Sequence, residues 1–238
     1  FNIRVPEHKL STLRARHGAG EPPQKRPRMA AMTSIRWSEP LVMNDGAVVP
    51  RLLILGDSQL VCQWTRGHWR TKCPQYASLV RHFWGMFGSW LSLCLGNPPA
   101  KWDEFIRHVY REHNRAADRE AGKHRWDFYA VGDQEFLETV LFRVQFDGSF
   151  TADGSGAGVV VYGTKVFRNS MSMILRASVP LQVSSALQAE LCACGCAMII
   201  LHKLLCKDSV DNIRSVMKKF SDLSFNEFCI VLEHSVRA

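Results

Sequence analysis

The sequence contains no Cys-x-x-Cys pair, although eight of its 238 residues are cysteines. Zinc knuckles and zinc ribbons are built on that spacing, so both classes of metal site are excluded. Cys192, Cys194 and Cys196 fall in one apolar segment and are expected to be small, reduced core residues. Reduced thiols predict an intracellular protein, either nuclear or cytoplasmic.

Long apolar runs are missing as well. The most apolar stretch, residues 191–201, is shorter than the ~20 residues of a membrane-spanning helix, and Glu190 and His202 bound it. The start of the chain carries no signal-peptide pattern. These features argue against a membrane partner.

Acidic residues are outnumbered: 22 Asp and Glu stand against 30 Lys and Arg, and the net charge is +8. This surplus favours a polyanionic partner such as nucleic acid. Residues 1–40 hold eight of the basic residues and three acids, with prolines at 22, 23 and 27. We expect this segment to be a basic disordered arm. Its Lys25–Arg28 cluster is either a nuclear-import or nucleic-acid patch or an ordinary solvated tail.

Residues 144–162 are predicted to form a β-hairpin. Val144 and Phe146 alternate with polar neighbours, which is the period of a half-buried strand. Glycines between 154 and 158 supply the turn, and a second apolar strand follows. Asp147 lies in mid-strand, where a carboxylate is costly to bury. A divalent metal ion is the natural compensation for this charge.

A second carboxylate lies near the start of an apolar helix. Ser184 and Ser185 are good N-cap residues, and Glu190 is the one acid in the nearly apolar helix that follows. Glu190 is either a residue that interacts favourably with the helix dipole or a second functional carboxylate.

A third carboxylate ends an apolar strand. Residues 52–55 form a continuous apolar run that stops at Gly56 and Asp57, as in a central strand covered on both faces. Asp57 is then presented at the carboxyl end of the strand, where open α/β sheets place their sites. Asp57 can equally be a helix N-cap with Ser58 behind it, and the two roles are compatible.

The segments after Asp57 complete the pattern. Trp64 to Lys72 is basic and interleaved with aromatic residues, which is typical either of phosphate contacts or of tryptophans packed under a surface helix. Apolar spacing predicts a helix over residues 76–95, alternation predicts a strand over 105–110, and a further helix opens within 111–121. In that last helix Asn114 and Asp118 are four residues apart and share a face.

These segments together resemble ribonuclease H of type 1, in its retroelement forms. The Asp-Gly-Ser strand, the glycine-rich hairpin and the Ala-Glu-Leu helix resemble the first half of that family over residues 142–203. The Asp-Ser-Gln-Leu-Val run at Asp57 and the block from His108 to Ala121 resemble its second half, except that Glu120 replaces the usual leucine. The resemblance implies an α/β fold, a ribonuclease H-like mixed five-stranded sheet flanked by helices, with its halves in swapped sequence order.

The resemblance also implies a reaction, which is metal-dependent hydrolysis of the RNA strand of an RNA–DNA hybrid. Two Mg²⁺ or Mn²⁺ ions would be held by four catalytic carboxylates, and no Ser-His-Asp or Cys-His nucleophile is needed. A reverse transcriptase domain is an implied partner. The alternative is a catalytically inactive nucleic-acid-binding module. The implied carboxylates are Asp147, Glu190, Asp57 and Asp118, and the implied nucleic-acid contacts are Gly148, Ser149, Ser58, Gln59, Asn114, Trp69 and Arg70.

The order of the segments leaves two organisations open. In one, residues 41–125 and 142–238 are the second and first halves of a single permuted domain, joined by a linker over 126–141; the last part of 142–238 is a C-terminal extension. In that case the Asp57 and Asp147 strands should be adjacent and parallel. In the other, the chain is a fragment of a tandem array, and Asp208 replaces Asp57 because residues 207–210 faintly echo residues 56–59. A domain-swapped homodimer is compatible with the pattern.

Overall fold

The computed structural model describes residues 41–42, 48–49, 51–95, 105–165 and 170–237. Every described residue belongs to one compact unit, Pro40–Ala238. The predicted arm over residues 1–40, with its Lys25–Arg28 cluster, lies outside the described residues.

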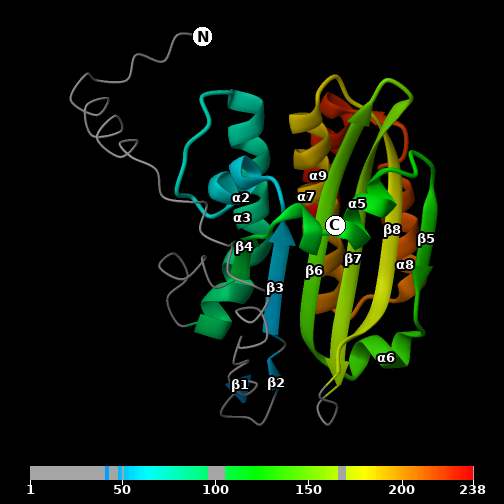
Figure 1. The fold of residues 1–238 in the computed structure, drawn as a ribbon. Coiled ribbons are helices and arrows are strands. Elements are labelled where there is room, and N and C mark those ends of the chain that lie inside the picture. Colours follow the sequence, from blue (N-terminus) through cyan, green and yellow to red (C-terminus); the bar gives the residue numbers. More distant parts are fainter. Residues whose placement is uncertain (1–40, 43–47, 50, 96–104, 166–169, 238) are drawn as a thin grey trace, which may run out of the picture. The chain divides into compact units, whose positions relative to one another are not determined.

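The described part of the chain is an α/β structure (Figure 1). Its strands are β1 (Leu41–Val42), β2 (Val48–Val49), β3 (Arg51–Gly56), β4 (Ile106–His108), β5 (Asp127–Ala130), β6 (Thr139–Thr151), β7 (Gly154–Lys165), β8 (Ser172–Gln182) and β9 (Leu223–Ser224). Its helices are α2 (Gln59–Thr65), α3 (Pro74–Leu95), the 3-10 turn η2 (Arg111–His113), α5 (Arg115–Ala121), α6 (Asp133–Leu137), α7 (Ala186–Leu205), α8 (Val210–Lys218) and α9 (Phe225–Arg237).

The main sheet is mixed. Its strands lie in the order β4-β3-β6-β7-β8-β5, with β9 pairing β8 beside this path, and β1 and β2 form a separate two-stranded sheet. The β6–β7–β8 meander and the β5–β8 pair are antiparallel, whereas β3 pairs parallel with both β4 and β6. The predicted mixed sheet flanked by helices is therefore confirmed at this level.

The pairing of β3 with β6 joins two distant parts of the chain. Ile54 lies opposite Val144, and Gly56 lies opposite Phe146. A Cβ at Gly56 would overlap the Phe146 ring, so glycine is needed for this close packing. The prediction that the Asp57 and Asp147 strands are adjacent and parallel is confirmed.

Helices cover both faces of the sheet (Figure 1). Helix α5 packs on β6, β7 and β8 from one side, in front of the sheet in Figure 1. Helix α7 packs on β6 and β7 from the other side and is itself packed against α2, α3, α8 and α9. Buried residues of β6, such as Val144 and Phe146, lie in the core beneath α7. This arrangement places β6 in the middle of three layers.

Among the described residues the main sheet has seven strands, so the prediction of five is wrong. The segment 126–141, expected to be a linker, contains β5 and α6, and β5 pairs antiparallel with the outer edge of β8. Residues 223–224 form β9, which also pairs with β8. Both additions cover an edge that would otherwise present unpaired backbone groups to solvent.

Four cysteine thiols lie in the core. Cys62, Cys192, Cys194 and Cys196 are buried, as expected for the last three, whereas Cys206 is exposed. Burial raises the pKa of the Cys62 thiol to about 12 and raises the pKa of Cys194 as well. A thiol held protonated and out of solvent reacts slowly.

These thiols give a direct test of the packing. Brief alkylation of the native protein, followed by peptide mass spectrometry, is expected to label Cys206 at least tenfold faster than Cys194. The unfolded protein should show similar rates at both positions. Fast labelling of Cys194 under native conditions would contradict the core described above.

Helix α7 is longer than the apolar run recognised in the sequence. It spans 20 residues and is long and apolar enough to cross a membrane, by length and composition. Ser185 caps it by accepting a hydrogen bond from the Gln188 backbone N–H at 3.3 Å, as the N-cap prediction required. In the structure most of α7 is buried against the sheet and the neighbouring helices.

Candidate metal centre

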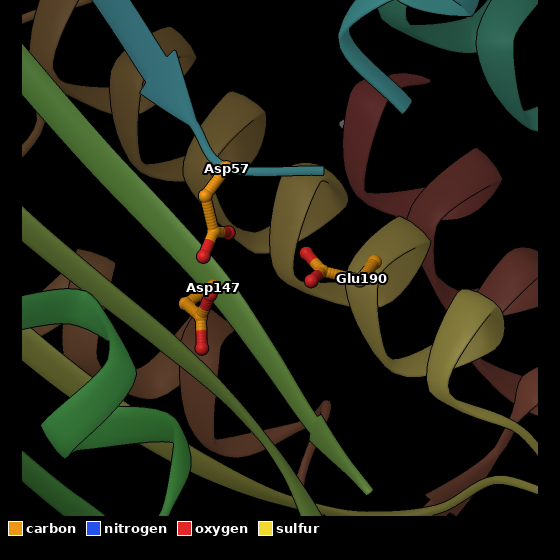
Figure 2. Close-up of side chains that lie close together, drawn as sticks. All are labelled: Asp57, Asp147 and Glu190. Atoms are coloured by element: carbon orange, nitrogen blue, oxygen red, sulfur yellow. The ribbon is translucent and has the colours of Figure 1, made fainter. Parts of the chain in front are cut away.

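Three carboxylates meet at one end of the β3–β6 pair. Asp57, Asp147 and Glu190 each offer an oxygen, and these three oxygens lie within 4.8 Å of one another (Figure 2). They come from three elements far apart in sequence: the end of β3, the middle of β6 and the second turn of α7. The cluster therefore forms only when the two halves of the chain pair.

The parallel pairing sets the position of Asp57. β3 ends at Gly56, opposite Phe146, so the next residue of each strand is a carboxylate. Asp147 lies opposite Gly158 on β7, and the space beside Gly158 is filled by Ala117 and Ala121 of α5. Residues directly opposite on antiparallel strands share a face, so the Asp147 side chain lies on the α5 side of the sheet.

Glu190 reaches the cluster from the opposite side. Gly148 allows this approach, because a Cβ there would overlap the backbone of Ala189 and Glu190. The Gly148 N–H also lowers the pKa of the Glu190 carboxyl group, which favours its charged form. Gly148 therefore positions α7; its predicted contact with nucleic acid stays a prediction.

Asn114 links the two strands at the cluster. Its Nδ2 donates to the Phe146 carbonyl at 2.8 Å and lies 3.3 Å from Asp57 Oδ1 and 3.4 Å from Asp147 Oδ1. Asn114 is fully buried, directly before α5. The amide thus holds the two aspartates together at the junction of both faces, whereas its predicted contact with substrate is untested.

Burial and mutual repulsion disfavour the ionised forms of the clustered carboxyl groups. Burial is the largest cause that raises the pKa of Asp147 to about 9, followed by its hydrogen bond to Asp57 and the charges of Glu190, Asp57 and Asp118. Burial, and then the Asp57 charge, raise the pKa of Glu190 to about 8, although the Gly148 N–H and Arg111 act in the opposite direction. Without a cation, protons would occupy this site at neutral pH.

The donor set suits a hard divalent cation. Mg²⁺ and Mn²⁺ prefer carboxylate oxygens, and here three acids converge. Glu190 Oε2 is buried and has no hydrogen-bond partner among the described residues. This carboxylate oxygen therefore lacks the partner that a buried polar atom needs. A cation bound between the carboxylates would supply that partner and remove the mutual repulsion. The three residues therefore fit a metal ion.

Asp118 lies beside this cluster and outside it. Its Oδ1 accepts a hydrogen bond from Arg111 Nη2 at 2.6 Å, and 38% of its side chain is exposed. The predicted face shared with Asn114 does not bring Asp118 among the three convergent oxygens. The Asp118 charge still acts on the cluster, since it raises the pKa of both Asp147 and Glu190.

The remaining predicted contact residues lie around α2. Ser58 caps this helix by accepting from the Val61 N–H at 3.5 Å, so the cap is Ser58 and not Asp57. Gln59 begins α2 and is exposed, and the loop after α2 exposes Trp69 (50%) and Arg70. Their predicted contacts with nucleic acid are untested. The exposed residues Gln59, Trp69 and Arg70 are accessible to a ligand.

Two contacts near the cluster were not predicted from the sequence. His124 Nε2 lies 3.0 Å from Ser149 Oγ, two residues along β6 from Asp147. The His124 ring packs over Gly154 and Gly156, where any Cβ would meet the ring or α5. The second contact is the Arg111–Asp118 pair. Arg111 lies in η2 and Asp118 in α5, so the fold rather than a single helix brings this pair together, as it does His124 and Ser149.

Asp208 lies elsewhere. It follows the C-terminal end of α7, and its Oδ2 lies 3.1 Å from Lys203 Nζ. Asp208 lies between the helices α7 and α8, whereas Asp57 follows a strand, so the echo of residues 56–59 is not repeated in the structure. Asp57 is the residue that accompanies Asp147.

No protein-family model, curated protein or solved structure matches this chain. The chemistry of the site is accordingly argued from its own geometry.

Proposed function

We propose that this protein is a metal-dependent endonuclease that hydrolyses the RNA strand of RNA–DNA hybrids. The observation that carries the proposal is the convergence of Asp57, Asp147 and Glu190 within 4.8 Å at the end of two adjacent parallel strands. The net charge of +8 supports a polyanionic substrate. Retroelement origin and an associated reverse transcriptase domain remain part of the proposal through the ribonuclease H resemblance.

In this proposal the metal ions supply Lewis-acid activation of a water molecule and stabilisation of the leaving 3′-oxygen. The chain supplies the geometry. Asn114 holds Asp57 and Asp147 in register, and the Gly148 N–H favours the charged form of the Glu190 carboxyl group. Burial of Asp147, which is only 4% exposed, keeps bulk water from competing for its oxygens. Ser149, whose Oγ lies 3.0 Å from His124 Nε2, would contact a 2′-hydroxyl, the group that separates RNA from DNA.

The order of the segments is part of the proposal. β3 belongs to the half that an ordinary ribonuclease H has second, and β6 to the half that it has first. Their pairing supports one permuted domain more than a fragment of a tandem array. The structured segment 126–141 would then join the ancestral ends, with β5 lying along β8.

The test is strand-specific cleavage by the full chain. An end-labelled 20-base-pair RNA–DNA hybrid in Mg²⁺ should yield RNA fragments and intact DNA, and EDTA should stop the reaction. Duplex DNA of the same sequence serves as the control and should stay whole. Binding of the hybrid without cleavage would replace this proposal with the inactive nucleic-acid-binding module.

The loss of cleavage rate is expected to depend on how close the replaced acid lies to the cluster. Asp118→Asn should lower the cleavage rate by about tenfold, because Asp118 acts on the cluster only through its charge. Asp208→Asn, a matched replacement at the far end of α7, should leave the rate within twofold. Equal losses for both variants would mean that position relative to the cluster does not matter, against the proposal.

A mixing experiment addresses the domain-swapped dimer. Inactive Asp57→Asn and Asp147→Asn chains, unfolded together and refolded, should stay inactive if β3 and β6 pair within one chain. Restored cleavage would show that two chains exchange halves, because one of the two sites would then hold both aspartates.

A further inference from the structure

A basic surface lies at the β5 edge of the main sheet, which is the edge opposite β4. An open cavity of about 480 Å³ lies between Trp126, next to β5, and the helix α8. Three strands, β6, β7 and β8, lie between β3 and β5. At a strand spacing of ~4.8 Å, the cavity beside β5 is roughly 20 Å from the end of β3, where Asp57 lies. Its lining residues are Trp126, Asp211, Arg214, Ser215, Lys218 and Lys219.

The ring of Trp126 lines the cavity, and the Phe128 ring lies beside it. The Trp126 and Phe128 rings lie 6.1 Å apart with planes within 10°, since residues two apart in a strand share a face. Lys218 Nζ lies 4.8 Å from the centre of the Trp126 ring, and Arg214 Cζ lies 5.3 Å from the centre of the Phe128 ring. Each ring therefore offers a π face that already attracts a cation.

The charge of the cavity is positive. Arg214, Lys218 and Lys219 are exposed, and the one lining acid, Asp211, lies 3.2 Å from Arg214. Arg214 and Lys218 are four residues apart, so both point toward the rings from one face of α8. Their long side chains can leave a ring for a phosphate without any change in the backbone.

We propose that this cavity binds single-stranded nucleic acid. An unpaired base stacks on Trp126 or Phe128, and the neighbouring phosphates bind Arg214, Lys218 and Lys219. The cavity volume lies within the range of sites that hold one small ligand, which suits a nucleotide. A paired base has no free face to offer these rings, so a duplex would use the cations alone. The site goes beyond the proposed nuclease, because it needs neither the carboxylates nor a metal ion.

Fluorescence anisotropy with a labelled 12-nucleotide oligo(U), in EDTA, tests this site without any cleavage. Trp126→Leu should weaken binding about tenfold or more, because base–aromatic stacking is lost, whereas Trp126→Phe should stay within threefold. The Arg214→Gln/Lys218→Gln variant should also reduce the slope of log affinity against log salt by about 1.4, at ~0.7 for each phosphate contact. Melting curves exclude variants that fail to fold.

A matched control removes the same charge elsewhere. Arg81 and Lys207 are exposed and do not line the cavity, so Arg81→Gln/Lys207→Gln should bind oligo(U) almost as tightly as the wild type. Equal losses in both double variants, or unchanged binding by Trp126→Leu, would overturn the site. Cleavage of a blunt hybrid by Trp126→Leu should match the wild type, which separates this proposal from the nuclease.

Discussion

Replacing Asp147 by asparagine is expected to abolish Mg²⁺-dependent cleavage and, at the same time, to stabilise the metal-free protein at pH 8. The loss of one ligand should remove several kcal/mol of transition-state stabilisation, which corresponds to about a thousandfold in rate. The gain in stability follows because asparagine keeps an oxygen for Asn114 and carries no charge. A residue that only supports the fold would show the opposite effect on stability.

The pH dependence of unfolding reports the same residue. The pKa of Asp147 rises from 3.8 to about 9 in the folded, metal-free chain, so between these values the folded state binds a proton that the unfolded state has released. The stability that this proton contributes is present at low pH and is lost as pH rises through this window. In EDTA, the wild-type protein should lose on the order of 4 kcal/mol from this group between pH 5 and pH 8, or roughly 10 °C in Tm. Asp147→Asn should lose less; an equal loss in the variant would contradict the assignment.

Gly148→Ala is expected to have the largest effect on folding. The added Cβ would overlap the backbone of Ala189 and Glu190, and a helix backbone cannot move aside as a flexible side chain can. Helix α7 carries much of the core, so its displacement should cost about 3 kcal/mol or more in the free energy of unfolding. The same displacement moves Glu190, so metal binding should fall with stability.

Gly85→Ala is the matched control for this change. Gly85 lies inside α3, and a Cβ there would meet no atom within 4 Å. Alanine in an exposed helix interior is preferred over glycine by ~0.5–1 kcal/mol, so this variant should be slightly more stable. Urea titrations measure both free energies. Similar values for the two variants would mean that α7 does not lie against Gly148.

The carboxylates could be found from the sequence because each one breaks an apolar pattern. Asp147 interrupts an alternating strand, Glu190 is the lone acid near the start of an apolar helix, and Asp57 ends an apolar run. The parallel pairing of their strands was expected only for the single permuted domain that the ribonuclease H resemblance allows, and it is what the structure has. Local periodicity was sufficient for these elements, since buried strands and helices must match it.

Three features could not be predicted because they depend on tertiary contacts. Asp118 is held by Arg111, and nothing local in the sequence sets that side chain apart from the cluster. Residues 127–130 fall in the segment expected to be a linker, yet they form β5 because the edge of β8 is open to pairing. The glycines at 156 and 158 read as a turn, whereas they lie within β7 and leave space for α5.

Calorimetric titration of Mn²⁺ into the metal-free protein tests most directly whether two distant halves of the chain build one metal site. The wild type should bind Mn²⁺, Asp57→Asn and Asp147→Asn should each bind at least tenfold more weakly, and Asp208→Asn should bind like the wild type. Unchanged affinity in Asp57→Asn, with a loss in Asp147→Asn, would mean that β3 does not bring its carboxylate to β6. That result would contradict the account.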